Sequence, residues 1–336
     1  MRRNRYLLIS ALVLIIIALL VRERFVLDRA RLTTDDEVVK EEFSLYKALH
    51  PKENALDEKI FTDAGEDVSD RVVTEKAPLL KNPLTPPVNP ITAEAYVVGN
   101  LETGEIYMSQ GKDSVFPIAS ISKLYTSLIA RHVMDPEKKV EITEEALLGY
   151  GEAGHLVLGE KFSPEELLYP LVLESSNDAA EAFAFSYGYG QFLVEMNAFA
   201  QEIGMSKTFF RDASGISPGN ISSAQDLFAF SRYLYSYEKS LLDITKTREY
   251  ILATTTDHGS HRFVSINPLT RNEYFIGGKT GRTNEAGESM VSLFKYQFGD
   301  TTYPIAIIVL RSRFGEREAD TGRLLSRFMT SIGKGM

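Results

Sequence analysis

Two regions with strand character enclose a helical middle in the segment that follows residue 90. Alternating apolar and polar residues rich in β-branched and aromatic types predict a hairpin at the start of this segment and several strands near its end. Capping residues and apolar repeats at helical spacing predict helices between them. The sheet must then be assembled from distant parts of the chain. We therefore expect an α/β (α+β) fold, in which helices flank an antiparallel sheet, an all-helical lobe is inserted, and the cleft between the two holds the site.

Turn and capping signals give the expected bounds of these elements. Ser163, Pro164 and Glu166 combine an N-cap, a proline at the first helical position and a reciprocal acid, so a helix begins there. Ser223 with Asp226 opens another helix. The predicted strands are 95–98, 106–108, 262–266, 274–279, 289–295 and 305–310, and the predicted helices are 164–174, 178–185, 191–203, 223–235 and 318–332.

Composition excludes several classes of function. The net charge of -9 and the pI near 5.3 argue against a nucleic-acid partner, which would favour a basic face. The chain has no cysteine, which excludes disulfides, thiolate catalysis and cysteine-based metal sites. The five histidines show no zinc-binding spacing, and we interpret the close pair His258 and His261 as part of a solvated loop. We expect no metal ion and no other cofactor.

An uncharged apolar run covers residues 6–21, with three arginines before it and two close behind it. As a helix it would span about 24 Å, somewhat short of the hydrocarbon core of a bilayer, and the flanking arginines could extend its reach. A cleaved signal peptide is the alternative, but no small-x-small cleavage site follows the run. We interpret residues 1–22 as a transmembrane signal anchor. The excess of arginine on its N-terminal side predicts a single-pass protein of the cell membrane with its catalytic domain outside the cytoplasm.

Residues 23–90 differ from the segments on either side in their mixed charge and weak periodicity. One helix is predicted from residue 35 to about residue 49, because Thr34 and Glu37 form a capping box before an apolar repeat. Prolines between Pro78 and Pro90 stiffen the rest of the segment. We therefore interpret 23–90 as a stalk and 91–336 as the folded domain.

Ser120 and Lys123 lie in a stretch with helical character that follows the predicted hairpin. Pro117 fits the first turn of that helix, because an amide at that position has no intrahelical partner. Side chains three residues apart share one face, so the lysine amine can reach the serine hydroxyl. A hydroxyl attacks poorly at neutral pH unless a base takes its proton. A lysine can be that base where burial or nearby charge keeps its amine neutral part of the time.

The Ser-x-x-Lys pattern alone is weak evidence, because ordinary surface pairs also produce it. Two further motifs distinguish Ser120. Ser175-Ser176-Asn177 matches Ser-x-Asn, and Lys279-Thr280-Gly281 is the only Lys-Thr-Gly sequence in the chain. Taken singly, Ser175 and Asn177 also fit a helix-end capping pair, and Lys279 also fits a lysine that protects a sheet edge. The other copies of Ser-x-x-Lys begin at Ser44, Ser109, Ser236, Ser292 and Ser331.

The order, spacing and context of the three motifs resemble those of penicillin-binding proteins and class A β-lactamases. Residues from about 91 to 336 resemble the D-alanyl-D-alanine carboxypeptidases of the low-molecular-mass penicillin-binding proteins, which have a β-lactamase/transpeptidase-like fold. Such an enzyme trims peptidoglycan stem peptides through an acyl-enzyme, and β-lactams inhibit it covalently. The segments 167–180, 212–215 and 278–287 carry the same resemblance.

The resemblance implies roles for the residues of the first two motifs. Ser120 would be the acylated nucleophile, and Lys123 would be its general base. Ser175 would relay a proton to the leaving amine, whereas Asn177 would orient Lys123 and the substrate amide. Asp178 is assigned to structure.

The resemblance also implies roles for residues of the third motif. Lys279 and Thr280, at a strand edge, would bind the terminal carboxylate of the substrate. Gly281 would let the substrate backbone approach the strand closely. The backbone amides of Ser120 and Arg282 would form an oxyanion hole.

One position departs from the pattern of the family. Some members carry an arginine before the asparagine in the strand that precedes Lys-Thr-Gly, whereas Ile266 precedes Asn267 in this chain. Carboxylate recognition would therefore depend on Lys279, Thr280 and Arg282. Relatives with a C-terminal membrane attachment carry it after an added β domain, a role that the N-terminal anchor would take here.

Three other functions remain open at this point. A D,D-endopeptidase that cleaves peptidoglycan cross-links would carry nearly the same motifs. A class A β-lactamase would need a Glu-x-x-x-Asn element between the second and third motifs, and no such element lies between Asn177 and Lys279. A non-catalytic module that binds the wall or senses β-lactams would not require the intact Ser120, Lys123 and Ser175.

Overall fold

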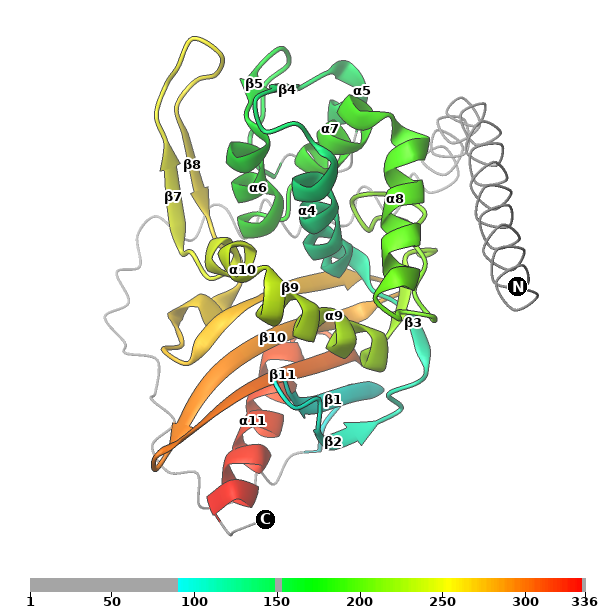
Figure 1. Cartoon of the computed structure of the whole chain (residues 1–336), viewed down its shortest axis with the longest axis vertical. Coiled ribbons are helices and arrows are strands. Elements are labelled where there is room, and N and C mark those ends of the chain that lie inside the picture. The colour runs from blue at the N-terminus through cyan, green and yellow to red at the C-terminus, as the bar shows by residue number, and fades with distance from the viewer. Residues whose placement is uncertain (1–89, 149–152, 334–336) are drawn as a thin grey trace, which may run out of the picture.

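The computed structural model describes residues 90–148 and 153–333, and in these ranges helices cover both faces of a sheet (Figure 1). Five strands, each antiparallel to its neighbours, form the sheet in the order β2-β1-β11-β10-β9. The predicted α/β class with an antiparallel sheet is confirmed. The strands of this sheet are β1 (Ala95–Asn100), β2 (Ile106–Gln110), β9 (Phe275–Thr283), β10 (Gly287–Phe298) and β11 (Thr301–Ser312).

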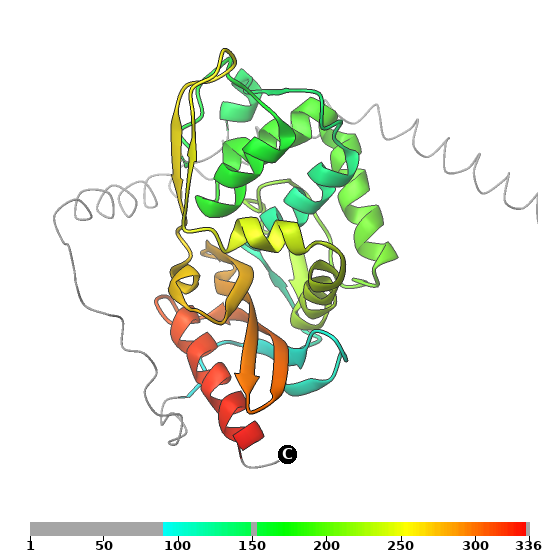
Figure 2. The ribbon, with the colours of Figure 1, turned by 60° about the vertical axis from the view of Figure 1, so that its left-hand side comes forward.

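Both faces of the sheet are buried, which explains the unbroken apolar sequence of β11. Successive side chains point to opposite faces, so Ile308 and Leu310 join the larger core while Ile307 and Val309 join the smaller one. Helix α11 (Arg317–Gly333) covers the face with the smaller core. Helices α9 (Ala224–Tyr237) and α10 (Lys239–Thr245) pack on the other face (Figure 2).

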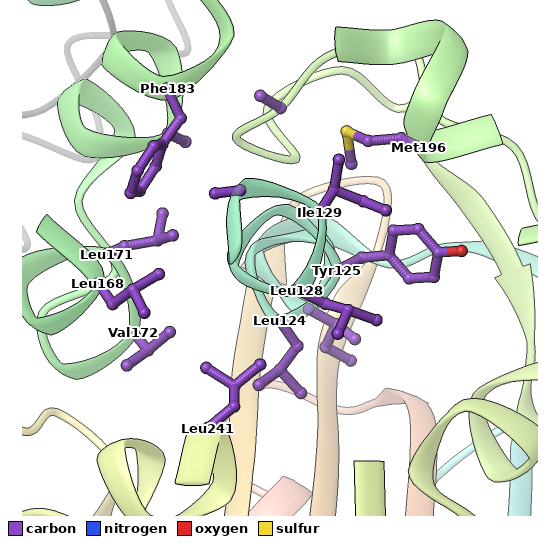
Figure 3. Packing of buried hydrophobic residues seen from close by; sticks show 14 of the residues in the cluster. Leu124, Tyr125, Leu128, Ile129, Leu168, Leu171, Val172, Phe183, Met196 and Leu241 are labelled. Carbon is purple, nitrogen blue, oxygen red and sulfur yellow. The ribbon is translucent and has the colours of Figure 1, made fainter. Parts of the chain in front are cut away.

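Helices α4 to α8, which lie between β2 and β9 in the sequence, form a lobe above the sheet. Helix α4 (Ser122–Val133) lies at the centre of this lobe. Every residue of α4 from Ser122 to Ala130 is buried. Figure 3 shows Leu168 and Leu171 of α6 on one side of this helix and Met196 of α8 on another. A central buried helix holds its first turn rigidly. The other helices of the lobe are α5 (Glu144–Leu147), α6 (Pro164–Leu173), α7 (Asn177–Tyr187) and α8 (Tyr189–Glu202).

The lobe is not all-helical, which corrects the prediction from sequence. Strand β4 (Val140–Glu141) pairs with β5 (Lys161–Phe162) at its far end. Strands of two residues are too short to leave an alternating pattern in a sequence.

Pro117 does not begin a helix, contrary to the prediction. It ends β3 (Val115–Pro117), which pairs with β6 (Ile221–Ser223). The chain then forms a 3-10 turn, η1 (Ala119–Ile121), before α4 begins at Ser122. Pairing with a segment distant in sequence keeps Pro117 extended, and local patterns do not reveal such pairing.

His258 and His261 are buried, not solvated as the sequence suggested, with exposed fractions of 4% and 8%. They lie near the tip of a hairpin in which β7 (Glu249–Leu252) pairs with β8 (His261–Val264). Both rings pack against Phe162, with centroid distances of 4.8 and 5.4 Å. The described residues contain no group of histidine and acidic side chains that could hold a metal ion.

Asp320 joins the beginning of the described domain to its last helix. Its carboxylate accepts hydrogen bonds at 2.9 Å from the backbone N–H groups of Thr92 and Ala93, and another at 2.6 Å from the Thr92 hydroxyl. Arg323 donates to the same carboxylate at 2.8 Å. The segment before β1 is thereby fixed to α11.

The predicted anchor, 1–22, and all but the last residue of the predicted stalk, 23–90, lie outside the described residues. Within residues 90–148 and 153–333, no helix has both the length and the apolar character required to cross a bilayer.

Candidate active site

Ser120 lies on η1, at the junction between the sheet and the helical lobe. Its hydroxyl Oγ accepts a hydrogen bond of 3.0 Å from the amine Nζ of Lys123, in the first turn of α4. The preceding residue, Ala119, has a φ of 48°, in the left-handed region that non-glycine residues rarely adopt. The structure therefore brings the two residues of the first motif into direct contact, on a backbone that holds local strain.

Lys123 is completely buried, and three acceptors surround its amine. Besides Ser120 Oγ, these are Asn177 Oδ1, at 2.6 Å, and the backbone carbonyl of Ser214. Burial lowers the pKa of Lys123 to about 8, although nearby carboxylates, first Asp212, raise it. The amine is thus neutral in about one molecule in ten at pH 7 and in about half of them near pH 8.

The second motif lies in the turn between α6 and α7. Ser176 caps α7, because its hydroxyl accepts the backbone N–H of Ala179 at 3.2 Å. Asn177 is consequently the first residue of that helix, and its side chain reaches Lys123. Ser175 adopts a left-handed φ of 63°. The predicted helix 164–174 is confirmed as α6, which ends at Leu173, just before this motif.

Lys279 lies on β9, at the edge of the sheet, and is 2% exposed. Its amine donates hydrogen bonds of 2.9 Å to the hydroxyl of Ser175 and to the backbone carbonyl of Thr280. Burial holds the pKa of Lys279 well below its usual value, and the positive charges of Lys123 and Arg317 lower it further. The third motif therefore contacts the second one directly.

Two glycines allow the backbone to close around η1. A Cβ atom at Gly281 of β9 would lie 2.6 Å from the carbonyl oxygen of Ile118, so only glycine fits there. A Cβ atom at Gly215 would lie 2.1 Å from the carbonyl oxygen of Ala119. The sequence suggested that Gly281 makes room for substrate, and the structure shows that it first makes room for the segment that carries Ser120.

Thr280 is buried beside Lys279, whereas the Arg282 side chain is exposed. Because Arg282 pairs with Glu288 of β10 along the backbone, its position on the edge strand is fixed although its side chain is free to reach solvent. Hydrogen bonds thus join Ser120, Lys123 and Asn177 of the first two motifs, and another joins Ser175 of the second motif to Lys279 of the third. The Arg282 side chain takes part in neither group.

Three charged residues of the site were given no role from the sequence, although Asp212 begins the segment 212–215 that carries part of the resemblance. Glu181 is fully buried one turn after Asn177, and Asp212 is buried in the loop that presents the Ser214 carbonyl. Arg317, at the start of α11, donates to the backbone carbonyl of Gly281 at 3.4 Å. The sequence contains one signal for Glu181, which is that a carboxylate stands within the alanine-rich segment of α7. Such segments normally bury only apolar side chains, so a carboxylate there indicates a special role.

This arrangement defines a serine hydrolase whose hydroxyl faces a lysine in place of a histidine. A comparison with protein families matches residues 81–304 to the D-alanyl-D-alanine carboxypeptidases, peptidase family S11. The chain belongs to this family, and the resemblance that the motifs indicated is confirmed. It is a serine peptidase.

Known proteins support the same assignment. A D-alanyl-D-alanine endopeptidase of Haemophilus influenzae is 33% identical over 230 residues, which cover 66% of this chain and 76% of that protein. The solved Streptomyces K15 DD-transpeptidase is 26% identical with a TM-score of 0.65, over 74% of this chain and all of that one. Penicillin-binding protein D2 of Listeria monocytogenes, solved in its ampicillin-bound form, is 30% identical with a TM-score of 0.60, over 71% of this chain and 98% of that one.

Proposed function

We propose that the protein is a serine-type D-Ala-D-Ala carboxypeptidase that trims peptidoglycan stem peptides through an acyl-enzyme on Ser120. The observation that carries this proposal is the hydrogen bond of 3.0 Å between Ser120 Oγ and the buried amine of Lys123. Membership of the D-alanyl-D-alanine carboxypeptidase family supports the same substrate class. The ampicillin-bound relative supports β-lactams as covalent inhibitors.

In the acylation step, the neutral amine of Lys123 takes the proton of Ser120 Oγ as that oxygen bonds to the carbonyl carbon of the penultimate D-alanine. The backbone amides of Ser120 and Arg282 stabilise the developing oxyanion, and each such donor is typically worth about 2.7 to 4 kcal/mol. Asn177 keeps the Lys123 amine in place, since its oxygen accepts from that amine at 2.6 Å.

In the second half of the reaction the carbon–nitrogen bond breaks, and the proton taken by Lys123 passes through the Ser175 hydroxyl, which is hydrogen-bonded to Lys279, to the amine of the departing D-alanine. Lys123 is then neutral again. It takes a proton from the water that attacks the ester on Ser120 and returns a proton to Ser120 Oγ as the ester carbon–oxygen bond breaks. Lys279 and Thr280 would bind the terminal carboxylate of the substrate, and Arg317, which donates to the Gly281 carbonyl, supplies positive potential beside them.

A D,D-endopeptidase is the second candidate, because the Haemophilus relative carries that name. Mass analysis of products separates the two activities. We expect release of free D-alanine from a stem pentapeptide ending in D-Ala-D-Ala, and slower cleavage of a cross-linked peptide dimer. Cleavage of the dimer without release of D-alanine would instead assign the endopeptidase. A β-lactamase is disfavoured by the absence of a Glu-x-x-x-Asn element between Asn177 and Lys279.

We also propose that residues 1–22 anchor the protein in the cell membrane and that residues 23–90 form a stalk outside the cytoplasm, leaving 91–336 as the peptidase domain. The uncharged run 6–21 and its flanking arginines support this arrangement. N-terminal sequencing of the protein extracted from membranes tests it. An intact N-terminus is expected, whereas a mature protein that begins beyond Val21 would show a cleaved signal instead.

A further inference from the structure

Ser122 is a serine beside the nucleophile that the proposed mechanism does not use. It lies two residues after Ser120, at the start of α4, and is fully buried. Its hydroxyl donates a hydrogen bond of 2.8 Å to the backbone carbonyl of Ala119. Its backbone N–H donates to the same oxygen. Ser122 thus supplies two donors to the carbonyl that directly precedes the nucleophile.

The Ala119 carbonyl belongs to the same peptide group as the N–H of Ser120, which is one of the proposed oxyanion donors. This peptide group is trans and planar, so its C=O and its N–H point in opposite directions. A contact that fixes the Ala119 oxygen therefore also fixes the direction of the Ser120 N–H. This direction matters, because a hydrogen bond weakens steeply when its angle departs far from linearity.

We propose that Ser122 is a positioning residue whose hydroxyl orients the oxyanion hole by holding the Ala119 carbonyl in place. This inference rests on the proposed function, in which the Ser120 amide binds the substrate oxygen. It adds a residue that acts through the backbone of the nucleophile without touching the substrate.

Hydrogen bonds of Asn220 determine which way the Ser122 hydroxyl points. The Asn220 side chain is fully buried, and its oxygen Oδ1 accepts the backbone N–H groups of Arg211 and Asp212 at 2.7 and 3.1 Å. Its nitrogen Nδ2 donates to Ser122 Oγ at 3.0 Å. A serine hydroxyl has a single proton. Because Asn220 supplies the proton of its own bond, the Ser122 proton is left for the Ala119 carbonyl.

The peptide group between Ala119 and Ser120 is strained and tightly packed. The left-handed φ of Ala119, 48°, costs energy for a residue with a side chain. A Cβ atom at Gly215 would lie 2.1 Å from the Ala119 oxygen and 3.0 Å from the Ser120 nitrogen, so the glycine backbone packs against this peptide. The Asp212 carboxylate holds Gly215 there by accepting its N–H. A strained peptide that lost such contacts would turn toward a relaxed conformation, and the Ser120 N–H would turn with it.

Ser122→Ala tests the proposal, because it removes the hydroxyl and keeps the backbone N–H that donates to the Ala119 carbonyl. We expect the second-order rate of labelling by a fluorescent penicillin to fall by a factor of roughly 10 to 100, less than the roughly 10² to 10³ that loss of a whole oxyanion donor causes. A rate equal to that of the wild type would overturn the proposal.

Infrared spectroscopy separates this role from a purely structural one. Benzylpenicillin with carbon-13 at its β-lactam carbonyl forms an acyl-enzyme whose labelled ester oxygen lies in the oxyanion hole. Well-aligned donors there polarise the C=O bond and lower its stretching frequency. We expect the labelled band of Ser122→Ala to lie at a higher frequency than that of the wild type. A slower or less stable variant whose band does not move would assign Ser122 to folding alone, and the proposal would be wrong.

A second variant, Ser122→Cys, guards against loss of folding in the first. The thiol fills the space of the hydroxyl but is a weak hydrogen-bond donor. Labelling should slow and the band should move in the same direction as in Ser122→Ala. Wild-type values of both quantities in this variant would contradict the proposal.

Ser127→Ala is the matched control, because Ser127 is also fully buried on α4 and its hydroxyl also donates to backbone carbonyls, those of Lys123 at 2.6 Å and Leu124 at 3.0 Å. These carbonyls do not belong to the peptide group that carries the Ser120 N–H. The rate and the band of this control should equal those of the wild type, and equal changes would rule out a specific effect of Ser122. Failure of the proposed function would be distinguishable, since neither penicillin would then label the wild-type protein.

Discussion

Replacing Ser120 with alanine should leave a folded protein that fluorescent penicillin no longer labels and that releases no D-alanine from a stem pentapeptide. The change removes a single oxygen from a partly buried side chain, and its hydrogen-bond donor Lys123 keeps two other acceptors. The backbone of η1 should therefore stay in place. Without that oxygen no ester can form, so we expect labelling to fall to background, measured by gel fluorescence and by intact mass.

The chain supplies a matched control in its other Ser-x-x-Lys sequences. Ser109 lies exposed on β2, and Lys112, three residues later, pairs instead with Asp113 at 3.0 Å. Ser109→Ala should be labelled as the wild type is. Labelling that persists in Ser120→Ala would refute the assignment of the nucleophile.

Lys123→Met should reduce the rate of acylation by a factor of roughly 10² to 10⁴, the range that general-base catalysis usually supplies. Methionine has a similar length and suits a fully buried position, but it has no lone pair basic enough to take the Ser120 proton. The nucleophile itself remains, so a slow residual reaction is expected. Stopped-flow or timed labelling at saturating and limiting penicillin gives the rate.

Thermal unfolding must be measured in parallel for Lys123→Met, because the substitution also removes a cation that faces the buried Asp212 carboxylate. Lys112→Met, the same change in the exposed copy of the motif, is the control and should label at the wild-type rate. An acylation rate for Lys123→Met within about threefold of the wild type, in a folded protein, would show that another group accepts the proton.

Much of the fold was predictable because its local signals and its long-range contacts agree. The capping box at Ser163 begins α6 as expected, and Ser223 caps α9 by accepting the backbone N–H of Asp226. The late strands were found because β11 is rich in β-branched residues. Their order in the sheet was not predicted, since pairing between β1 and β11 depends on the whole chain and not on either segment.

Local signals failed where distant segments decide the conformation. Pro117 suits a helix start, yet pairing of β3 with β6 keeps it extended. His258 has the sequence context of a loop, but it stacks on Phe162 at an interplanar angle of 8°. Tertiary packing outweighs local preference at both positions.

The three motifs named the residues that meet around Ser120, but sequence could not show what surrounds them. The Ser214 carbonyl that accepts from Lys123 is a backbone group, which any residue type could supply. Glu181 belongs to the site only because it follows Asn177 by one turn on a buried face of α7, which the sequence alone does not show. The three-dimensional structure is needed to identify such groups as part of the site.

The two glycines that close on η1 limit how this centre can change over evolution. A Cβ atom at Gly281 or Gly215 would clash with the carbonyl oxygen of Ile118 or Ala119, which precede the nucleophile, so any larger residue would displace that segment. Mutational tolerance here is restricted by main-chain contacts and not by the chemistry of side chains. Variants that escape β-lactams should therefore carry their changes at other positions, while Gly215, Gly281 and the segment just before Ser120 stay unchanged.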